Sequence, residues 1–252
     1  MSRYTDHPAP EGVTTRGTIL VVPGRGETHE TYARLGARLS ADAYHVRVVD
    51  PPLLDPADPA PSLTRFAKEL GEAADAPDGV PAVRPVVVIG SDAGAAAVAA
   101  VLARTGAAWQ PDGVVLAGLP SRAAPERATW EEELDLRTAC PVHRRRLTDD
   151  GQVHRGALGT PVPGPVLALA EESETPVPTL LLVGDADPLA DHQALLAKAR
   201  SLPRARLSRV RGAHHDVLND AQHRSVAAEI VTFLEGLRDG MAPAVSVAAS
   251  AW

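Results

Sequence analysis

The sequence predicts an α/β protein built on a mostly parallel, doubly wound sheet. Short apolar runs alternate with helical patterns along most of the chain, and polar turns follow several of the runs directly. Such alternation implies parallel strands joined by right-handed crossovers, with helices on both faces of the sheet. A chain of 252 residues suits one such domain and is too short for two.

Composition narrows the range of partners. The net charge is −7, and basic residues are scattered among acidic ones, whereas nucleic-acid binding needs a concentrated basic face. The only cysteine is Cys140, so no intrachain disulfide can form. The sequence shows neither the apolar run of a signal peptide nor a run of about 20 apolar residues that would span a membrane. We therefore expect a cytoplasmic protein with a small-molecule substrate and no nucleic-acid or membrane partner; the sequence is compatible with a homodimer.

The first half of the chain contains three buried strands and the helices between them. A Pro-Gly turn ends the first strand, Thr28 can cap the first helix, and a Pro-rich loop precedes the second helix. The elements expected here are strands over 17–22, 45–49 and from 86, and helices after Thr28, over 62–74 and from the end of the third strand to about 104.

The alternation is interrupted between residues 121 and 178 and then resumes. The interruption is too long for a plain connection, which predicts a lid over the site. We expect strands over 112–118, 179–183 and 205–210, and helices over 189–202 and 221–237. The predicted organisation is thus a core of residues 1–120 and 179–240, a lid insertion of 121–178 and a flexible tail of 241–252.

The third apolar run ends in Gly90-Ser91-Asp92-Ala93-Gly94, directly before an Ala-rich helix. This is the pattern of a nucleophile elbow, a sharp strand-to-helix turn that lifts one side chain above the sheet. Crowding requires small residues two positions before and after the tip. Gly90 and Gly94 satisfy this around Asp92, whereas Ser91 at the tip would place Ile89 in one of these positions. We therefore predict Asp92 at the tip.

Two further polar turns supply candidates for a catalytic acid and a catalytic histidine. Gly184-Asp-Ala-Asp187-Pro follows one late strand, and Arg211-Gly-Ala-His-His215-Asp follows the next. The sequence order of nucleophile, acid and histidine is that of α/β-hydrolases. All these turns fall at the carboxyl edge of the sheet, where ligands bind in such folds. Adjacent His214 and His215 lack a third ligand at suitable spacing, so no metal site and no cofactor are expected.

From about residue 17 to residue 237 the chain resembles the α/β-hydrolase fold family, and locally its lysophospholipase and monoacylglycerol-lipase branch. The run 23–27, Pro-Gly-Arg-Gly-Glu, is similar to that branch's His-Gly-x-Gly-Glu loop, and 212–220 is similar to its Gly-Ala-x-His-Glu-x-x-Asn-Glu segment. The resemblance implies His215 as catalytic histidine and Asp187 as its acid. It also implies an oxyanion hole formed by the backbone N–H groups of Arg25 and Ala93.

An aspartate at the elbow resembles haloalkane dehalogenases, haloacetate dehalogenases and epoxide hydrolases of the same fold. The activating residues of those families are absent from their usual places. The three tyrosines lie outside the insertion, Ala93 stands where haloalkane dehalogenases usually have Trp, and no arginine follows the elbow. The sequence therefore does not identify the leaving group of the substrate.

A carboxylate nucleophile is ionised at neutral pH and can form an alkyl-enzyme ester, which water activated by His215 then hydrolyses. Two alternatives remain open: an ester, thioester or lactone hydrolase in which Asp92 or His215 acts on water, and a non-hydrolytic lyase, cyclase or binding protein. Four residues are candidates for substrate contact: Gly24 in the early loop, and Trp130, Arg137 and His143 in the insertion. The Arg25 side chain is a further candidate for binding an anionic group.

Overall fold

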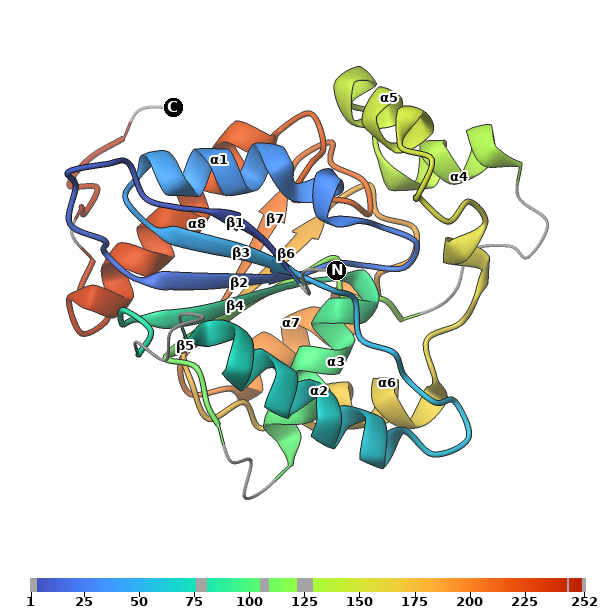
Figure 1. Cartoon of the computed structure of the whole chain (residues 1–252), viewed down its shortest axis with the longest axis horizontal. Coiled ribbons are helices and arrows are strands. Elements are labelled where there is room, and N and C mark those ends of the chain that lie inside the picture. Colours follow the sequence, from blue (N-terminus) through green and yellow to red (C-terminus); the bar gives the residue numbers. More distant parts are fainter. Residues whose placement is uncertain (1–3, 76–80, 105–108, 122–128, 244, 251–252) are drawn as a thin grey trace.

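The computed structural model describes residues 4–75, 81–104, 109–121, 129–243 and 245–250. Its centre is a seven-stranded sheet in the order β1-β3-β2-β4-β5-β6-β7, in which only β1 runs antiparallel to its neighbour (Figure 1). The strands are β1 (Tyr4–His7), β2 (Thr18–Val22), β3 (His45–Val49), β4 (Val86–Ser91), β5 (Gly113–Ala117), β6 (Thr179–Gly184) and β7 (Ala205–Val210). The predicted fold class is confirmed.

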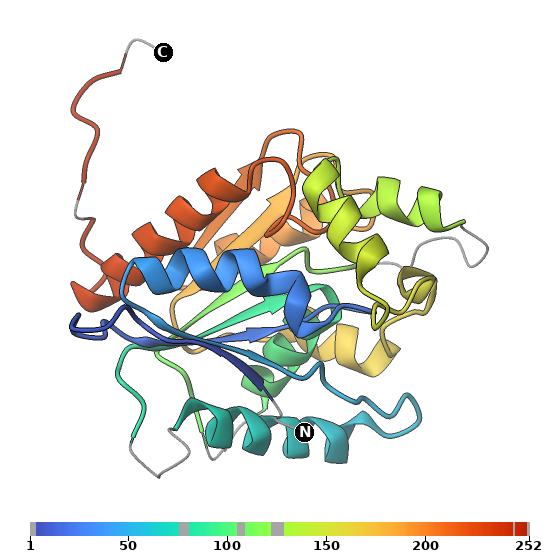
Figure 2. The same ribbon diagram turned by 45° about the horizontal axis from the view of Figure 1, so that its top comes forward.

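Helices cover both faces of the sheet, because its central strands are apolar on both sides. On one face α1 (Ala33–Ala41), which follows the short helix η1 (His29–Tyr32), lies beside α8 (His223–Arg238) (Figures 1 and 2). The other face carries α2 (Pro59–Ala74), α3 (Asp92–Ala103), α6 (Gly164–Glu172) and α7 (His192–Ser201). Side chains from these helices and from alternate strand positions form two buried clusters, one on each face.

Local sequence signals explain several helix boundaries. The helix α2 begins three residues earlier than predicted, since Asp58 accepts a hydrogen bond from the Ala60 N–H and Pro59 suits the first helical position. The start of α7 follows Asp191, whose carboxylate accepts from Gln193 N–H and Ala194 N–H. No apolar pattern predicts β1, a short polar strand that pairs with β3 at the sheet edge.

The predicted lid contains two different parts. The helices α4 (Trp130–Arg137) and α5 (Pro141–Asp149) and the short helix η2 (Ala157–Gly159) form a cap beyond the carboxyl edge of the strands (Figures 1 and 2). In contrast, α6 packs against α3 and buries Val166 and Ala170 in the core. Within the predicted insertion, α6 therefore belongs to the helical layer of the core.

The C-terminal segment departs from the domain. Its described residues beyond α8 contain no helix or strand and are exposed, with Val245 84% and Val247 79% exposed (Figure 2). Among the described residues, no helix is long and apolar enough to cross a bilayer.

Candidate active site

The elbow places Asp92 at the junction of β4 and α3. Asp92 has a φ of +48°, a left-handed conformation that non-glycine residues rarely adopt. A Cβ on Gly90 would lie 2.7 Å from Ala95 Cα, and one on Gly94 would lie 2.6 Å from the Pro23 carbonyl oxygen. Both neighbouring positions thus require glycine. Ser91, by contrast, is the last residue of β4 and is only 3% exposed.

Asp92, His215 and Asp187 form a hydrogen-bonded chain. The His215 Nε2 atom lies 3.0 Å from Asp92 Oδ1, and its Nδ1 atom lies 2.9 Å from Asp187 Oδ2. Asp187 is also held by its turn, since its Oδ1 accepts from the Leu189 N–H at 2.9 Å. The three turns after β4, β6 and β7 therefore bring together the three side chains of the predicted triad, all at most 3% exposed.

The Arg25 side chain binds the Asp92 carboxylate from the opposite side. Its Nε donates to Oδ2 at 2.8 Å and its Nη2 to Oδ1 at 2.7 Å, a bidentate geometry. The Nη1 atom donates to the carbonyl oxygens of Leu158 and Thr160 in the cap, at 3.0 and 2.7 Å. Arg25 thus fastens the cap over the carboxylate. The sequence predicted the Arg25 N–H as an oxyanion-hole donor and the Arg25 side chain only as a further candidate for binding an anion.

The backbone at Arg25 also points at the site. Its N–H donates to Asp92 Oδ2 at 2.8 Å, where an oxyanion-hole donor would act. Ala93 lies in the first turn of α3, where backbone N–H groups lack an acceptor within the helix. The positive end of the α3 dipole also favours a negative charge on Asp92. Position 24 has to be glycine, because a Cβ added there would lie 2.8 Å from Asp92 Cβ.

Burial and charge set the protonation of the site. Burial opposes ionisation of Asp92, but Arg25 and the hydrogen bond from His215 outweigh it and hold the Asp92 pKa well below its usual range. Burial also disfavours a charged His215, yet Asp187 and then Asp92 raise the His215 pKa to about 10. At neutral pH the resting site therefore holds an imidazolium between two carboxylates, with Arg25 as a second cation.

Three insertion residues predicted to touch substrate make side-chain contacts within the protein. Trp130 donates from Nε1 to Thr148 Oγ1 at 3.2 Å and stacks under Arg155, both within the cap. Arg137 is 1% exposed, and its guanidinium is occupied by Glu133, Asp216 and the Arg25 carbonyl oxygen. His143 is 2% exposed and bonds Asp216 through Nε2 at 2.9 Å. A Trp, Arg or His in an insertion is weak evidence for substrate contact, because the same side chains also form the packing and ion pairs that hold the cap together.

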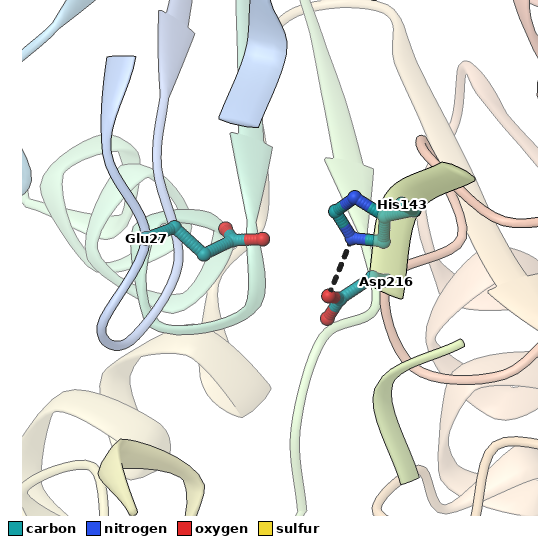
Figure 3. A group of neighbouring side chains, drawn as sticks. All are labelled: Glu27, His143 and Asp216. Atoms are coloured by element: carbon teal, nitrogen blue, oxygen red, sulfur yellow. Dashed lines mark hydrogen bonds and ion pairs between the residues drawn. The ribbon is translucent and has the colours of Figure 1, made fainter. Parts of the chain in front are cut away.

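The structure also brings together Glu27, His143 and Asp216, which no sequence pattern connects (Figure 3). Glu27 follows the Arg25 loop, Asp216 follows His215, and His143 comes from α5. No spacing rule links three residues from such distant segments, so the only available signal was the acidic residue in each of the two loop motifs. Glu27 lies two residues after Arg25, and Asp216 lies directly after His215.

No family model matches the chain, and no curated protein matches it by sequence. Solved structures do match over nearly the whole chain. The Paleococcus ferrophilus monoacylglycerol lipase has a TM-score of 0.68 at 19% identity, covering 93% of this chain and 98% of its own. The Saccharomyces cerevisiae monoglyceride lipase has a TM-score of 0.72 at 15% identity, covering 93% and 91%. MenH from S. aureus has a TM-score of 0.65 at 18% identity, covering 94% and 100%. The sheet order, the elbow and these likenesses together show that the chain has the α/β-hydrolase fold.

Proposed function

We propose that this protein is a hydrolase that forms an alkyl-enzyme ester on Asp92. The observation that carries the proposal is the Asp92–His215–Asp187 chain at the elbow, with hydrogen bonds of 3.0 and 2.9 Å. The matching lipases, together with an enol-lactonase from Burkholderia xenovorans, suggest that the fold supports hydrolysis here as well. An aspartate at the elbow turns that chemistry from acyl transfer towards substitution at a saturated carbon.

The reaction has two balanced steps. In the first, a carboxylate oxygen of Asp92 attacks a carbon that bears a leaving group, and the leaving group departs with the bonding electron pair. In the second, water attacks the carbonyl carbon of the Asp92 ester and gives its proton to His215. The Arg25 N–H, with Ala93 N–H, would stabilise the oxyanion; on collapse the carbon–oxygen bond to the alkyl group's oxygen breaks, and that oxygen takes a proton from His215 and leaves as an alcohol. Esterification removes one of the two carboxylates that keep His215 charged, which favours the neutral base needed for the second step.

The Arg25 contact determines what kind of substrate suits this route. Asp92 cannot attack while both of its oxygens are bound by the guanidinium, so Arg25 must exchange to another anion. A substrate carboxylate offers the same bidentate geometry. The proposed substrate class is therefore a small organic acid that carries a leaving group near its carboxylate.

The same clamp supports a second candidate, a non-hydrolytic protein that keeps the fold for binding or for lyase or cyclase chemistry. Asp92 Oδ1 accepts from His215 and Arg25, and Oδ2 accepts twice from Arg25. If the clamp stays closed on ligand binding, no ester can form. An ester hydrolase acting through water is the further alternative, and turnover of acyl nitrophenyl esters by Asp92→Asn would favour it.

Trapping the intermediate tests the proposal. His215→Gln protein is incubated with chloroacetate, 2-chloropropionate or neutral 1-chlorobutane, and its peptides are analysed by mass spectrometry. The proposal predicts an alkyl adduct on the Asp92 peptide, because the variant forms the ester without hydrolysing it. Asp92→Asn/His215→Gln is the matched control and should carry no adduct. Adducts of equal yield in both variants, or unmodified Asp92 in a variant that still releases product, would contradict the ester route.

A further inference from the structure

The Glu27, His143 and Asp216 side chains converge from the core and the cap on one buried point (Figure 3). Their ligand atoms all lie within 4.8 Å of one another, and the side chains are 5%, 2% and 3% exposed. Glu27 and Asp216 belong to core loops, whereas His143 belongs to α5 of the cap. The cluster therefore lies where the cap meets the core.

Outer contacts orient each carboxylate so that one oxygen faces the cluster. Glu27 Oε2 accepts from the Gly24 N–H at 2.7 Å and from the Tyr32 hydroxyl. Arg137 lies 3.4 Å from Asp216 Oδ1, which leaves Oδ2 for His143. Glu27 Oε1 is buried and has no hydrogen-bond partner among the described residues, and its carboxylate points towards His143 and Asp216 (Figure 3). An unpartnered carboxylate oxygen in the interior calls for a proton or a cation.

The charges around the cluster do not balance. The carboxylates of Glu27, Glu133 and Asp216 are all buried. Among the described residues, Arg137 is the guanidinium that faces all three. In the neighbouring triad, Arg25 and His215 pair with Asp92 and Asp187, so these four groups add no net positive charge. A bound divalent cation would cancel this excess of negative charge.

We propose that Glu27, His143 and Asp216 bind a divalent transition-metal ion that joins the cap to the core. Two carboxylate oxygens and one imidazole nitrogen suit Zn²⁺ or Mn²⁺, whereas Mg²⁺ and Ca²⁺ prefer oxygen ligands alone. Ligand atoms around a tetrahedral zinc ion are about 3.3–3.6 Å apart, given bonds of about 2.0–2.2 Å. The present separations, all within 4.8 Å, exceed this spacing by at most about 1.5 Å, and His143 would exchange its hydrogen bond to Asp216 for the metal.

Zinc retention tests the proposal directly. Protein purified without a histidine tag is unfolded, stripped with chelator and refolded with one equivalent of ZnCl₂, because a buried site has to fill during folding. Elemental analysis after gel filtration should find about one Zn²⁺ per chain for the wild type. The same procedure with MgCl₂ should leave no bound metal. A melting temperature that rises with Zn²⁺ gives a second readout that does not involve activity.

Two ligand variants and two control variants test whether the ion binds at this cluster. Glu27→Gln and His143→Gln should each lower zinc affinity at least about tenfold and abolish the shift in melting temperature. Glu30→Gln, and His154→Gln in the cap, remove an exposed glutamate and an exposed histidine and should bind zinc like the wild type. Less than about a tenth of an equivalent in refolded wild type, or equal retention in all four variants, would overturn the proposal. In the first case, a Glu27→Gln protein as stable as the wild type would identify the cluster as a proton-sharing network instead.

Discussion

At the scale of single residues, the distinctive feature is a carboxylate held between an imidazolium and a guanidinium. Asp92 occupies the elbow tip, His215 and Arg25 bind both of its oxygens, and Asp187 holds His215. The strained φ of +48° places the Asp92 carboxylate where all these groups meet. Substitutions of Arg25 and Asp92 can test the role of the Arg25 side chain separately from that of the Asp92 charge.

Replacement of Arg25 by glutamine should affect acidic and neutral substrates differently. The backbone N–H remains, but the bidentate contact to a substrate carboxylate is lost. Charge-assisted hydrogen bonds contribute about 1.5–3 kcal/mol, so we expect the KM for chloroacetate to rise about 10- to 100-fold. For neutral 1-chlorobutane, which makes no such contact and offers no anion to draw Arg25 away from Asp92, kcat/KM should stay unchanged or rise. Steady-state chloride release measures both, and an equal loss for both substrates would contradict the proposed role.

The Asp92 charge should also stabilise the fold in a pH-dependent way. Its pKa is lowered on folding, so its contribution is present above the unfolded value of about 3.9 and is lost as pH falls through the lower folded value. Asp92→Asn lacks this contribution but keeps the shape. The melting temperature of the wild type should therefore exceed that of the variant at pH 7, and the difference should shrink below about pH 4. A difference independent of pH would assign the effect to packing instead.

At the scale of elements, the junction of β4 and α3 depends on glycines that bring backbones close together. A Cβ on Gly94 would lie 2.6 Å from the Pro23 carbonyl oxygen and 2.7 Å from that of Val22, neither of which can yield easily. The helix therefore approaches β2 only with glycine at this position, which also keeps the Arg25 loop beside Asp92.

Two Gly→Ala substitutions test this claim with opposite expected signs. Gly94→Ala should lower the free energy of unfolding by about 1–3 kcal/mol through overpacking. Gly236→Ala lies within α8, where an added Cβ meets nothing within 4 Å, and should raise it by about 0.5–1 kcal/mol. Denaturant titration of both variants supplies the comparison. Equal effects would mean that the close approach at the elbow does not limit stability.

The elements also show how far a sequence can predict such a site. Asp92 follows β4 directly, Asp187 lies three residues after β6, and His215 lies five residues after β7, so the predicted strands already placed all three at one edge. Strand β1 escaped prediction because it is short and polar, and it is held partly by the Asp6 contact to buried Arg47 at 2.8 Å. The roles of Arg137 and His143 depend on how the cap folds back on the core, which local patterns do not encode.

At the scale of the whole molecule, buried ionic contacts join the cap to the core. Arg137 of α4 contacts Asp216 and the Arg25 carbonyl oxygen, while Arg25 reaches back to two cap carbonyl oxygens. The cap is thus held at the site itself, and access to Asp92 requires these contacts to exchange. Opening of the cap and release of Asp92 are in this view one event.

Removing one side of this connection should be costly. Arg137→Leu leaves Glu133 and Asp216 without their guanidinium in the interior, and we expect a loss of about 3–5 kcal/mol in the free energy of unfolding. Arg144→Leu is the control, since Arg144 pairs with exposed Glu131 and Asp135 and should cost at most about 1 kcal/mol. Hydrogen exchange should show faster opening of α4 and α5 in the first variant alone. Similar losses in the two variants would rule out a special role for the buried contact.

A single-turnover reaction in H₂¹⁸O decides whether Asp92 becomes covalently bound during turnover. Excess enzyme reacts once with a processed substrate such as chloroacetate, and the Asp92 peptide is then weighed by mass spectrometry. Since water attacks the Asp92 carbonyl carbon, the account predicts one ¹⁸O atom in the Asp92 carboxylate and none in the first product molecule. Product that carries the ¹⁸O while Asp92 stays unlabelled would show that water attacks the substrate directly, and would contradict the account.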